Sequence, residues 1–296
     1  MNINWYPGHM AKTKKQIADD LKLIDVVIEI LDARIPISSR NPEIETLIQD
    51  KKKIIVFNKQ DLADEKENER WIKYYQKQNI PAVLTDATNG KGIPEVIRTI
   101  EKITQEEKEI ASKKGRTGKS TRVMILGIPN VGKSSFINRI TQKSTTAVGN
   151  KPGVTKQKQG VRVNQKIELL DTPGVLWPKF QNEEIALHLA YTGTIKDDIL
   201  EKVEVAYFFL KWLLEKHILE ITKRYGIEKN SIQEILQNEE QMKNENIMQI
   251  MYLIGKRRGA VLAGGNIDEE KTANLLLEDF RSGKLGRMTI ETCEEI

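Results

Sequence analysis

This sequence lacks disulfide-forming cysteine pairs, long apolar runs and a secretory signal. It has a single cysteine, Cys293, in 296 residues, so no disulfide can form within the chain and a reducing compartment is favoured. No apolar stretch approaches the ~18 residues that a membrane-spanning helix needs. The start, MNINWYPGHMAKTKK, has no hydrophobic signal segment. The sequence therefore predicts a cytoplasmic protein with no membrane partner.

The composition is that of an ordinary globular protein, with 39% hydrophobic and 30% charged residues. The chain is long enough for one large domain and a smaller second one. Its formal net charge of +5 suggests a polyanionic partner. The basic side chains include a run without an acidic residue, formed by Lys113, Lys114, Arg116, Lys119 and Arg122. Either a basic linker or a nucleic-acid contact explains that run.

Short β-branched runs alternate with longer helical patterns in the first 178 residues. Strands are expected at 25–31, 53–57, 82–85, 122–126 and 167–170, and helices at 41–49, 65–77, 94–109 and 132–141. This alternation predicts an α/β fold, in which a parallel sheet lies between two layers of helices as a three-layer sandwich. Ligands of such sheets bind at the carboxyl ends of the strands. The loops that follow the strands should therefore contain the functional residues.

The pattern becomes wholly helical after residue 178. Helices are expected at 199–225, 231–237, 245–255 and 269–281, and no alternating strand pattern interrupts them. We therefore predict two domains, an α/β domain of residues 1–178 and an all-helical C-terminal domain of residues 179–296.

The strand expected at 122–126 leads into a phosphate-binding motif. The next eight residues, GIPNVGKS, fit the P-loop pattern GxxxxGK[ST] between a strand and a helix. The glycines let successive backbone N–H groups point at phosphates, and the following helix presents its positive N-terminus. Lys133 would bridge the β- and γ-phosphates, and the Ser134 hydroxyl would ligate Mg²⁺. Further contacts with the nucleotide are expected from Asn130, Val131, Gly132 and Ser135.

Two other loops predict recognition of guanine. The sequence NKQD follows the second strand, and its Asp61 carboxylate can accept hydrogen bonds from guanine N1–H and the 2-amino group, which adenine does not offer. Asn58 would brace this loop, and the Lys59 stem would lie over the ring. The sequence DATNG follows the third strand, with Asp86 where a serine is usual in GTPases. Asp86 would cap the loop while the Ala87 N–H meets guanine O6; alternatively, Asp86 is the N-cap of the next helix.

The strand at 167–170 is followed by DTPG, a DxxG motif. Asp171 would hold Mg²⁺ through a water, the Gly174 N–H would contact the γ-phosphate, and Thr155 is the candidate for a second hydroxyl ligand. Val175 stands where many GTPases have a glutamine that orients the attacking water, so a polar group must come from elsewhere in the chain or from a partner. His9, after a Pro-Gly turn, is the internal candidate; an exposed histidine without a catalytic role is the alternative.

The motifs follow one another in an unusual order. From the N-terminus they are NKQD, DAT, GIPNVGKS, GVT and DTPG, whereas an ordinary GTPase begins with its P-loop. To these are added the start YPGHMAK, the valine after DTPG and the stretch GKRRGAVLAGGNIDEEKTANLLLEDFRSGKLGR. With these features the sequence resembles the circularly permuted YlqF-type GTPases over nearly the whole chain.

The resemblance implies a bacterial GTPase that binds the maturing large (50S) ribosomal subunit and hydrolyses GTP to GDP and phosphate late in its assembly, stimulated by the particle. It implies that His9 is the catalytic histidine and that Asn130 supports K⁺ binding. We expect a monomer. The resemblance also implies an rRNA-binding C-terminal domain, with phosphate contacts from Lys256, Arg257, Arg258, Arg281, Lys284 and Arg287.

The residues alone leave alternatives to these implications. The basic stretch near the C-terminus can be a solvated helical face. The protein can also be a nucleotide-gated RNA-binding module in which hydrolysis is incidental, or a permuted GTPase that acts on a non-ribosomal RNA.

Overall fold

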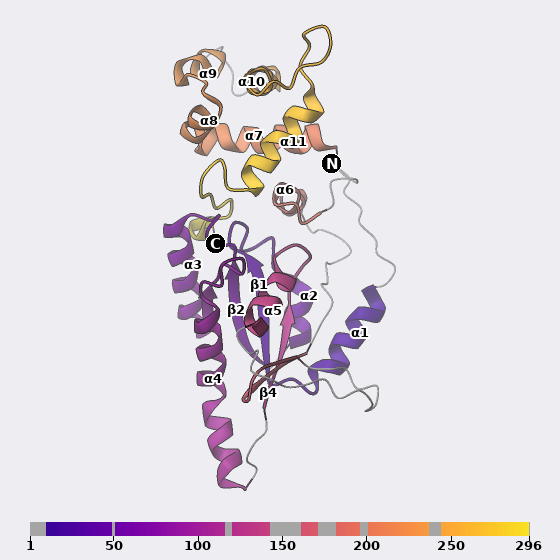
Figure 1. The fold of residues 1–296 in the computed structure, drawn as a ribbon, viewed down its shortest axis with the longest axis vertical. Coiled ribbons are helices and arrows are strands. Elements are labelled where there is room, and N and C mark those ends of the chain that lie inside the picture. The colour runs from indigo at the N-terminus through magenta and orange to yellow at the C-terminus, as the bar shows by residue number, and fades with distance from the viewer. Residues whose placement is uncertain are drawn as a thin grey trace. The chain divides into compact units, whose positions relative to one another are not determined.

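The computed structural model describes residues 10–48, 51–115, 120–142, 161–170, 182–195, 201–236 and 244–295. The chain divides into two compact units (Figure 1). An α/β unit contains the described parts of residues 4–179 together with the chain from Met288 onward, and a helical unit contains those of residues 180–287. No helix in these described ranges has the length and apolar character that would let it span a membrane.

The α/β unit is built on a six-stranded sheet with the order β3-β2-β1-β4-β6-β5. Its strands are β1 (Val26–Asp32), β2 (Lys52–Asn58), β3 (Ala82–Leu84), β4 (Thr121–Leu126), β5 (Val161–Asn164) and β6 (Ile167–Leu170). Neighbouring strands are parallel, except that β5 pairs antiparallel with β6. Every residue of β1 is buried, as expected for a central strand covered on both faces.

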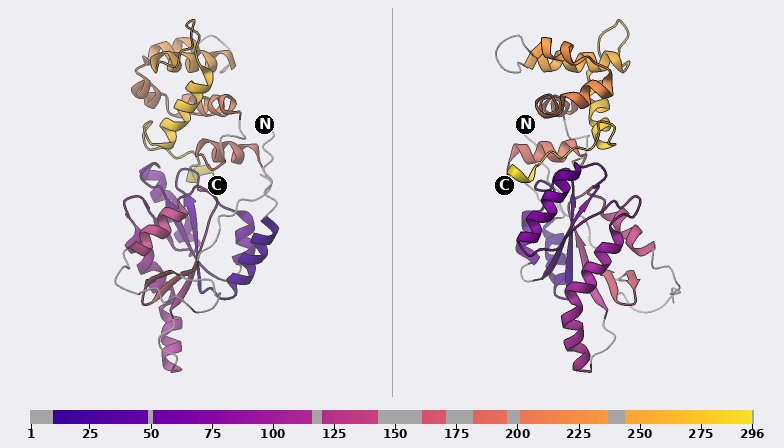
Figure 2. Two further views of the ribbon diagram at one scale, coloured as in Figure 1. Left: turned by 45° about the vertical axis from the view of Figure 1, so that its right-hand side comes forward. Right: turned by 90° about the vertical axis from the view of Figure 1, so that its left-hand side faces the viewer.

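Helices cover both faces of this sheet. They are α1 (Met10–Leu21), α2 (Pro42–Ile48), α3 (Glu65–Lys77), α4 (Ile93–Lys113) and α5 (Lys133–Gln142). Helices α1 and α2 pack with Val27 and Met124 in one cluster, and Trp71 and Tyr75 of α3 pack with Phe57 in another. Helices α4 and α5 lie on the opposite face (Figure 2). The chain passes from β1 to β2 to β3 in one direction across the sheet and then crosses back to β4 in the other direction. Because crossovers between parallel strands are right-handed, this reversal places the later helices on the opposite face. The predicted three-layer α/β fold is confirmed.

The helical unit consists of α6 (Glu183–Tyr191), α7 (Lys202–Lys216), α8 (Ile218–Tyr225), α9 (Lys229–Leu236), α10 (Asn244–Arg257) and α11 (Glu269–Arg281). Its core forms around α7, which packs against α6, α10 and α11. Phe209 lies at the centre, with its ring centroid 4.8 Å from that of Phe280 and 5.1 Å from that of Tyr191. The described residues of this unit contain no strand, as predicted; Val261 and Ile267 form only an isolated bridge.

Helix α3 and helix α11 have the predicted bounds, but other elements differ. Strand β5 was not predicted, because the alternation of its sequence VRVN extends over only four residues, of which one is buried. Helices α1 and α6 were also missed. The single helix predicted at 199–225 is divided at His217, whose φ of −137° ends α7 and begins α8. The periodicity continues across this break and therefore does not reveal it.

The end of the described chain also differs from the predicted domain division. Residues 179–296 were assigned together to the helical domain, whereas the structure places the chain from Met288 onward in the α/β unit. Met288 and Ile290 are buried there, and the short 3-10 helix η2 (Cys293–Glu295) contacts α3. The segment is too short and too lacking in periodicity to indicate this position from sequence.

Candidate functional site

The P-loop connects β4 to α5 and has the conformation that its glycines allow. Gly127 has a φ of +154°, and a Cβ there would lie 2.6 Å from Ile30 O. Gly132 has a φ of +96°, and a Cβ there would lie 2.2 Å from Asn58 Nδ2. Asn130 between them is also left-handed, with a φ of 61°. Glycine is thus required at position 132 for two reasons: the backbone has a positive φ, and the Asn58 side chain leaves no room for a Cβ.

The Asn58 side chain connects three of the predicted motif loops. Its Nδ2 donates to Val131 O of the P-loop at 2.8 Å. Its Oδ1 accepts from Ala87 N at 3.0 Å and from Thr85 Oγ1 at 3.2 Å. Only 2% of the Asn58 surface is exposed, so its side-chain amide forms hydrogen bonds with the protein rather than with water. The NKQD loop, the DAT loop and the P-loop therefore meet at one side chain, as their positions at strand ends predict.

Lys59 extends from the NKQD loop to the P-loop. Its Nζ donates to Asn130 O at 2.8 Å and lies 2.9 Å from Asp32 Oδ2 at the end of β1. Asp32 is fully buried and is also held by Arg34, whose Nη2 lies 2.8 Å from Oδ2 and whose Nε donates to Oδ1 at 3.0 Å. Burial opposes ionisation of Asp32, but the charges of Arg34 and Lys59 outweigh it and hold the pKa of this carboxyl far below its ordinary value. Asp61 is exposed two residues further on.

The DAT loop is organised by Asp86, which is buried. Its carboxylate accepts hydrogen bonds from Thr88 N at 2.8 Å and from the Thr88 hydroxyl. Asp86 thus caps its own loop, and the N-cap of α4 is Gly92 rather than Asp86. The sequence assigned the Ala87 N–H to guanine O6, and that contact stays a prediction. In the structure this N–H donates to Asn58 Oδ1, because the close approach of the two loops gives it an internal acceptor.

Lys133 lies at the first position of α5, and its side chain turns back over the P-loop. Its Nζ donates to Ile128 O at 2.6 Å. Burial lowers the pKa of this ammonium to about 8, so a bound phosphate would stabilise a charge that the protein alone stabilises poorly. Ser134 and Ser135 are exposed in the first turn of α5, where the N-terminus of the helix attracts anions. The Ser134 hydroxyl is accessible there, which fits its predicted role as a Mg²⁺ ligand.

The remaining predicted residues of the nucleotide site, His9, Thr155, Asp171 and Gly174, lie outside the described residues. Their roles stay predictions.

Sequence reasoning missed a contact between α5 and the DAT loop. The Arg139 guanidinium donates to Thr88 O and, at 3.4 Å, to Ala87 O. It also packs beside Gly90, where a Cβ would lie 3.1 Å from Arg139 Cδ. No motif marks this arginine, since one basic residue on an amphipathic helix is commonplace. The Asp32–Arg34 pair was likewise not predicted from the sequence.

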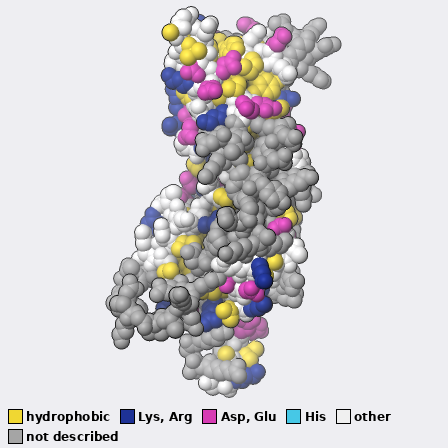
Figure 3. Space-filling model, turned by 90° about the vertical axis from the view of Figure 1, so that its right-hand side faces the viewer, with side chains coloured by type: hydrophobic (Ala, Val, Ile, Leu, Met, Phe, Trp, Pro, Cys, Tyr) yellow, Lys and Arg dark blue, Asp and Glu magenta, His cyan; other side chains and the backbone are white. Residues whose placement is uncertain are grey.

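The basic residues predicted to bind rRNA occur at two places in the helical unit. Lys256, Arg257 and Arg258 are exposed at the end of α10, and Lys284 and Arg287 are exposed after α11. Figure 3 shows one face of the molecule on which hydrophobic side chains gather over this unit, with Lys and Arg side chains beside them.

Arg281 has a different environment from the other five predicted rRNA contacts. Its side chain is 15% exposed, and its guanidinium donates to Tyr191 O at 3.1 Å and to Ala190 O at 2.8 Å. Arg281 thus adds a donor to the carbonyls at the end of α6, where Ala190 O also accepts from Gly193 N at 3.1 Å. These contacts leave little of the Arg281 side chain for an RNA phosphate.

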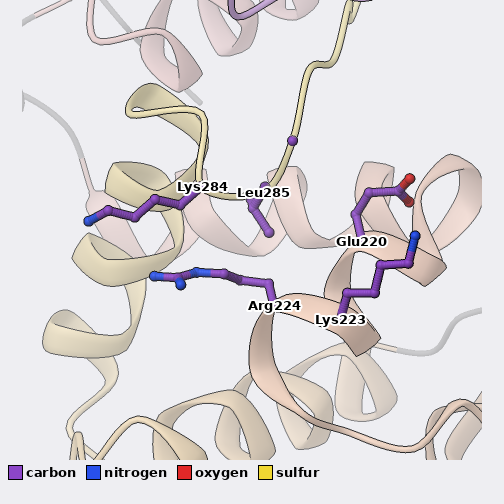
Figure 4. Close-up of a pocket in the computed structure, with 6 residues that line it drawn as sticks. Glu220, Lys223, Arg224, Lys284 and Leu285 are labelled. Carbon is purple, nitrogen blue, oxygen red and sulfur yellow. The ribbon is translucent and has the colours of Figure 1, made fainter.

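A pocket of about 470 Å³ lies between α8 and the chain after α11 (Figure 4). Glu220, Lys223 and Arg224 of α8 line it together with Lys284 and Leu285, and Glu220 lies beside Lys223 (Figure 4). Arg224 makes a two-bond pair with the buried Asp279, with N–O distances of 2.7 and 2.8 Å. Lys223 and Arg224 were not among the predicted contacts, because they lie outside the basic stretch that carried the resemblance.

Comparison with known proteins gives concordant matches. The model of the 50S ribosome-binding GTPase family matches residues 122–253. The chain is 43% identical over 296 residues to ribosome biogenesis GTPase A of Bacillus cereus, an alignment that covers all of this chain and 95% of that protein. It is also similar to two solved structures of YlqF, one bound to GDP and one from T. maritima bound to GNP. Their TM-scores are 0.65 and 0.64 at 24% identity, with coverage of 94% and 96% of this chain and of 99% and 100% of theirs.

Proposed function

Since the chain belongs to the ribosome biogenesis GTPase A family and is a GTPase, we propose that it hydrolyses GTP to GDP and phosphate during late assembly of the large (50S) ribosomal subunit. The ribosomal particle stimulates this hydrolysis, and the protein acts as a monomer in the cytoplasm. The names of its relatives support a role in ribosome biogenesis. The match to the 50S ribosome-binding family supports the large subunit as the partner.

The observation that carries the nucleotide specificity is the position of Asn58. Through this side chain, the loop that ends in Asp61 is held against the P-loop and the DAT loop. A nucleotide whose phosphates lie at the P-loop would therefore place its base beside Asp61. The exposed carboxylate there is available to accept hydrogen bonds from guanine N1–H and the 2-amino group, and a site of this kind disfavours a base that lacks those donors.

The phosphates would be held by P-loop N–H groups and by Lys133, whose ammonium already lies across the loop. Mg²⁺, held by Ser134, Thr155 and, through a water, Asp171, would neutralise negative charge on the β- and γ-phosphates. Asn130 would contribute to a K⁺ site, and the Gly174 N–H would contact the γ-phosphate. Because Val175 cannot orient water, His9 would do so once the particle places it.

The rRNA-binding surface would be formed by the exposed cations of the helical unit. The end of α10 presents Lys256 and Arg257 to solvent, and the chain after α11 presents Lys284 and Arg287; side chains of this kind contact RNA phosphates. Charge-neutralising substitutions at Lys256 and Arg257 should weaken particle binding and reduce its dependence on salt. Alanine at two exposed lysines of α3, Lys66 and Lys73, is the matched control and should change neither.

The deciding experiment is co-sedimentation with purified large subunits in a GTP analogue and in GDP, combined with GTPase assays with and without the particles. We expect co-sedimentation that depends on the nucleotide, and a GTPase rate that rises with the particles in the wild type but not in His9→Ala. Lys133→Ala, which removes nucleotide binding, is the negative control. Failure to co-sediment with either nucleotide would refute the ribosomal assignment, and a rise that persists in His9→Ala would refute the role of the histidine.

A further inference from the structure

The chain returns from the helical unit to the α/β unit at residues 288–294, here called the return segment. Its backbone runs between two loops of the α/β unit. Met288 N donates to Leu62 O at 2.9 Å, and Ile290 N donates to Arg34 O at 2.8 Å. Leu62 is the residue after the NKQD motif. The return segment thus joins the exit of the guanine-recognition loop to the loop that follows β1.

Two side chains of the return segment strengthen this junction. The Thr289 hydroxyl accepts a hydrogen bond from Asp64 N at 3.0 Å. The Glu291 carboxylate accepts from Ile37 N at 2.6 Å, from Ser38 N at 2.9 Å and from the Ser38 hydroxyl. Thr289 is 5% and Glu291 4% exposed. A buried carboxylate held by several donors is a strong constraint on the loop that supplies them.

A continuous series of polar contacts runs from the return segment to the P-loop. Ile290 fixes the backbone of Arg34, whose guanidinium holds the Asp32 carboxylate. That carboxylate lies 2.9 Å from Lys59 Nζ, which in turn donates to Asn130 O. Asp32 and Arg34, at the centre of this series, are buried, so water does not compete for the contacts between them. The position of Lys59 therefore depends on the loop that the return segment holds.

We propose that the return segment is part of the guanine-recognition site, with Thr289 and Glu291 as positioning residues. They hold the two loops that place Lys59 and Asp61 for the base. A loop that is ordered before binding loses less conformational entropy when the nucleotide arrives. Selectivity for the guanine 2-amino group, which depends on the position of Asp61, therefore depends on a segment more than 200 residues away in the sequence. This inference rests on the proposed guanine-nucleotide function.

The test measures selectivity rather than affinity alone. Calorimetry on the full chain would compare GDP with IDP, which lacks the 2-amino group, for the wild type, Glu291→Gln and Thr289→Val. We expect GDP affinity to fall about tenfold, a loss of about 1.4 kcal/mol, and IDP affinity to change less than twofold in both variants. Glu294→Gln is the matched control, since that side chain is 75% exposed and pairs only at the surface with Arg70; its GDP-to-IDP ratio should equal that of the wild type.

A melting temperature that falls while the GDP-to-IDP ratio stays at the wild-type value would overturn the inference, because the return segment would then stabilise the fold without positioning the loops. If Glu291→Gln fails to fold, Thr289→Val decides the matter by the same ratio, since it removes a single hydrogen bond and keeps the shape of the side chain. A wild type that binds ADP as well as GDP would overturn the proposed function itself. The two failures are therefore distinguishable.

Discussion

Replacement of Asn58 by alanine tests whether one buried amide holds the nucleotide site together. The substitution removes the hydrogen bonds to Val131 O at 2.8 Å, from Ala87 N at 3.0 Å and from Thr85 Oγ1 at 3.2 Å. All four residues are buried. The Thr85 hydroxyl can rotate toward another acceptor, but the two backbone groups cannot move without moving their loops.

The expected magnitude follows from the number of buried groups that lose their partner. Each unsatisfied buried backbone group costs about 1 to 3 kcal/mol, so two of them give a loss of about 3 kcal/mol in the free energy of unfolding. For a unit of this size, that loss lowers the melting temperature by roughly 6 to 12 °C. If bound nucleotide requires the three loops to be together, GDP affinity falls by up to about 10²-fold, the equivalent of the same free energy.

Two measurements on the purified protein check this prediction for Asn58→Ala: thermal unfolding without nucleotide and calorimetric titration with GDP. The matched control is Asn138→Ala, which changes the same residue type on the exposed surface of α5 and should leave both quantities close to the wild type. A melting temperature within about 2 °C of the wild type, together with unchanged GDP affinity, would show that Asn58 does not hold the loops.

Three further predictions concern the same site. Burial lowers the pKa of Lys133 to about 8, and bound phosphate would raise it. The ammonium of the free protein is therefore lost above pH 8, and GDP affinity should fall about tenfold between pH 7 and pH 9. An equal fall in Lys133→Arg, whose guanidinium does not titrate in this range, would contradict this cause. Asp61→Asn should shift preference from guanine to xanthine nucleotides, since an amide can donate to the 2-keto group; unchanged selectivity in competition assays would refute the assignment of Asp61. Gly132→Ala should lower the free energy of unfolding by about 1 to 3 kcal/mol more than Gly115→Ala. Both glycines have a positive φ, but a Cβ would meet an atom, Asn58 Nδ2, only at position 132. Equal effects of the two substitutions in denaturant titrations would exclude the clash.

The family and the fold class were accessible from the sequence. The GIPNVGKS and NKQD motifs follow strands that the structure places in the sheet, β4 and β2, and the resemblance they supported is confirmed by the comparisons. The same reasoning located α3 and α11 to the residue. Motifs and periodicity succeed here because they depend on neighbours a few residues apart, and those spacings are fixed by local backbone geometry.

Partners that are distant in sequence were not accessible in this way. Nothing local indicates that the Ala87 N–H would be taken by Asn58, that Arg139 of α5 would hold Thr88 O, or that Lys59 would meet Asp32. These contacts exist because parallel pairing brings the carboxyl ends of β1, β2 and β4 to one edge in a fixed register.

The sequence by itself therefore determined which loops carry the chemistry, through residue types at short spacings. Only the tertiary structure decided how those loops are held, and that the return segment with Thr289 and Glu291 belongs to the α/β unit rather than to the helices before it. The physical reason is that a hydrogen bond across more than 200 residues depends on where the whole sheet places its donor and acceptor, and no local pattern in either segment contains that information.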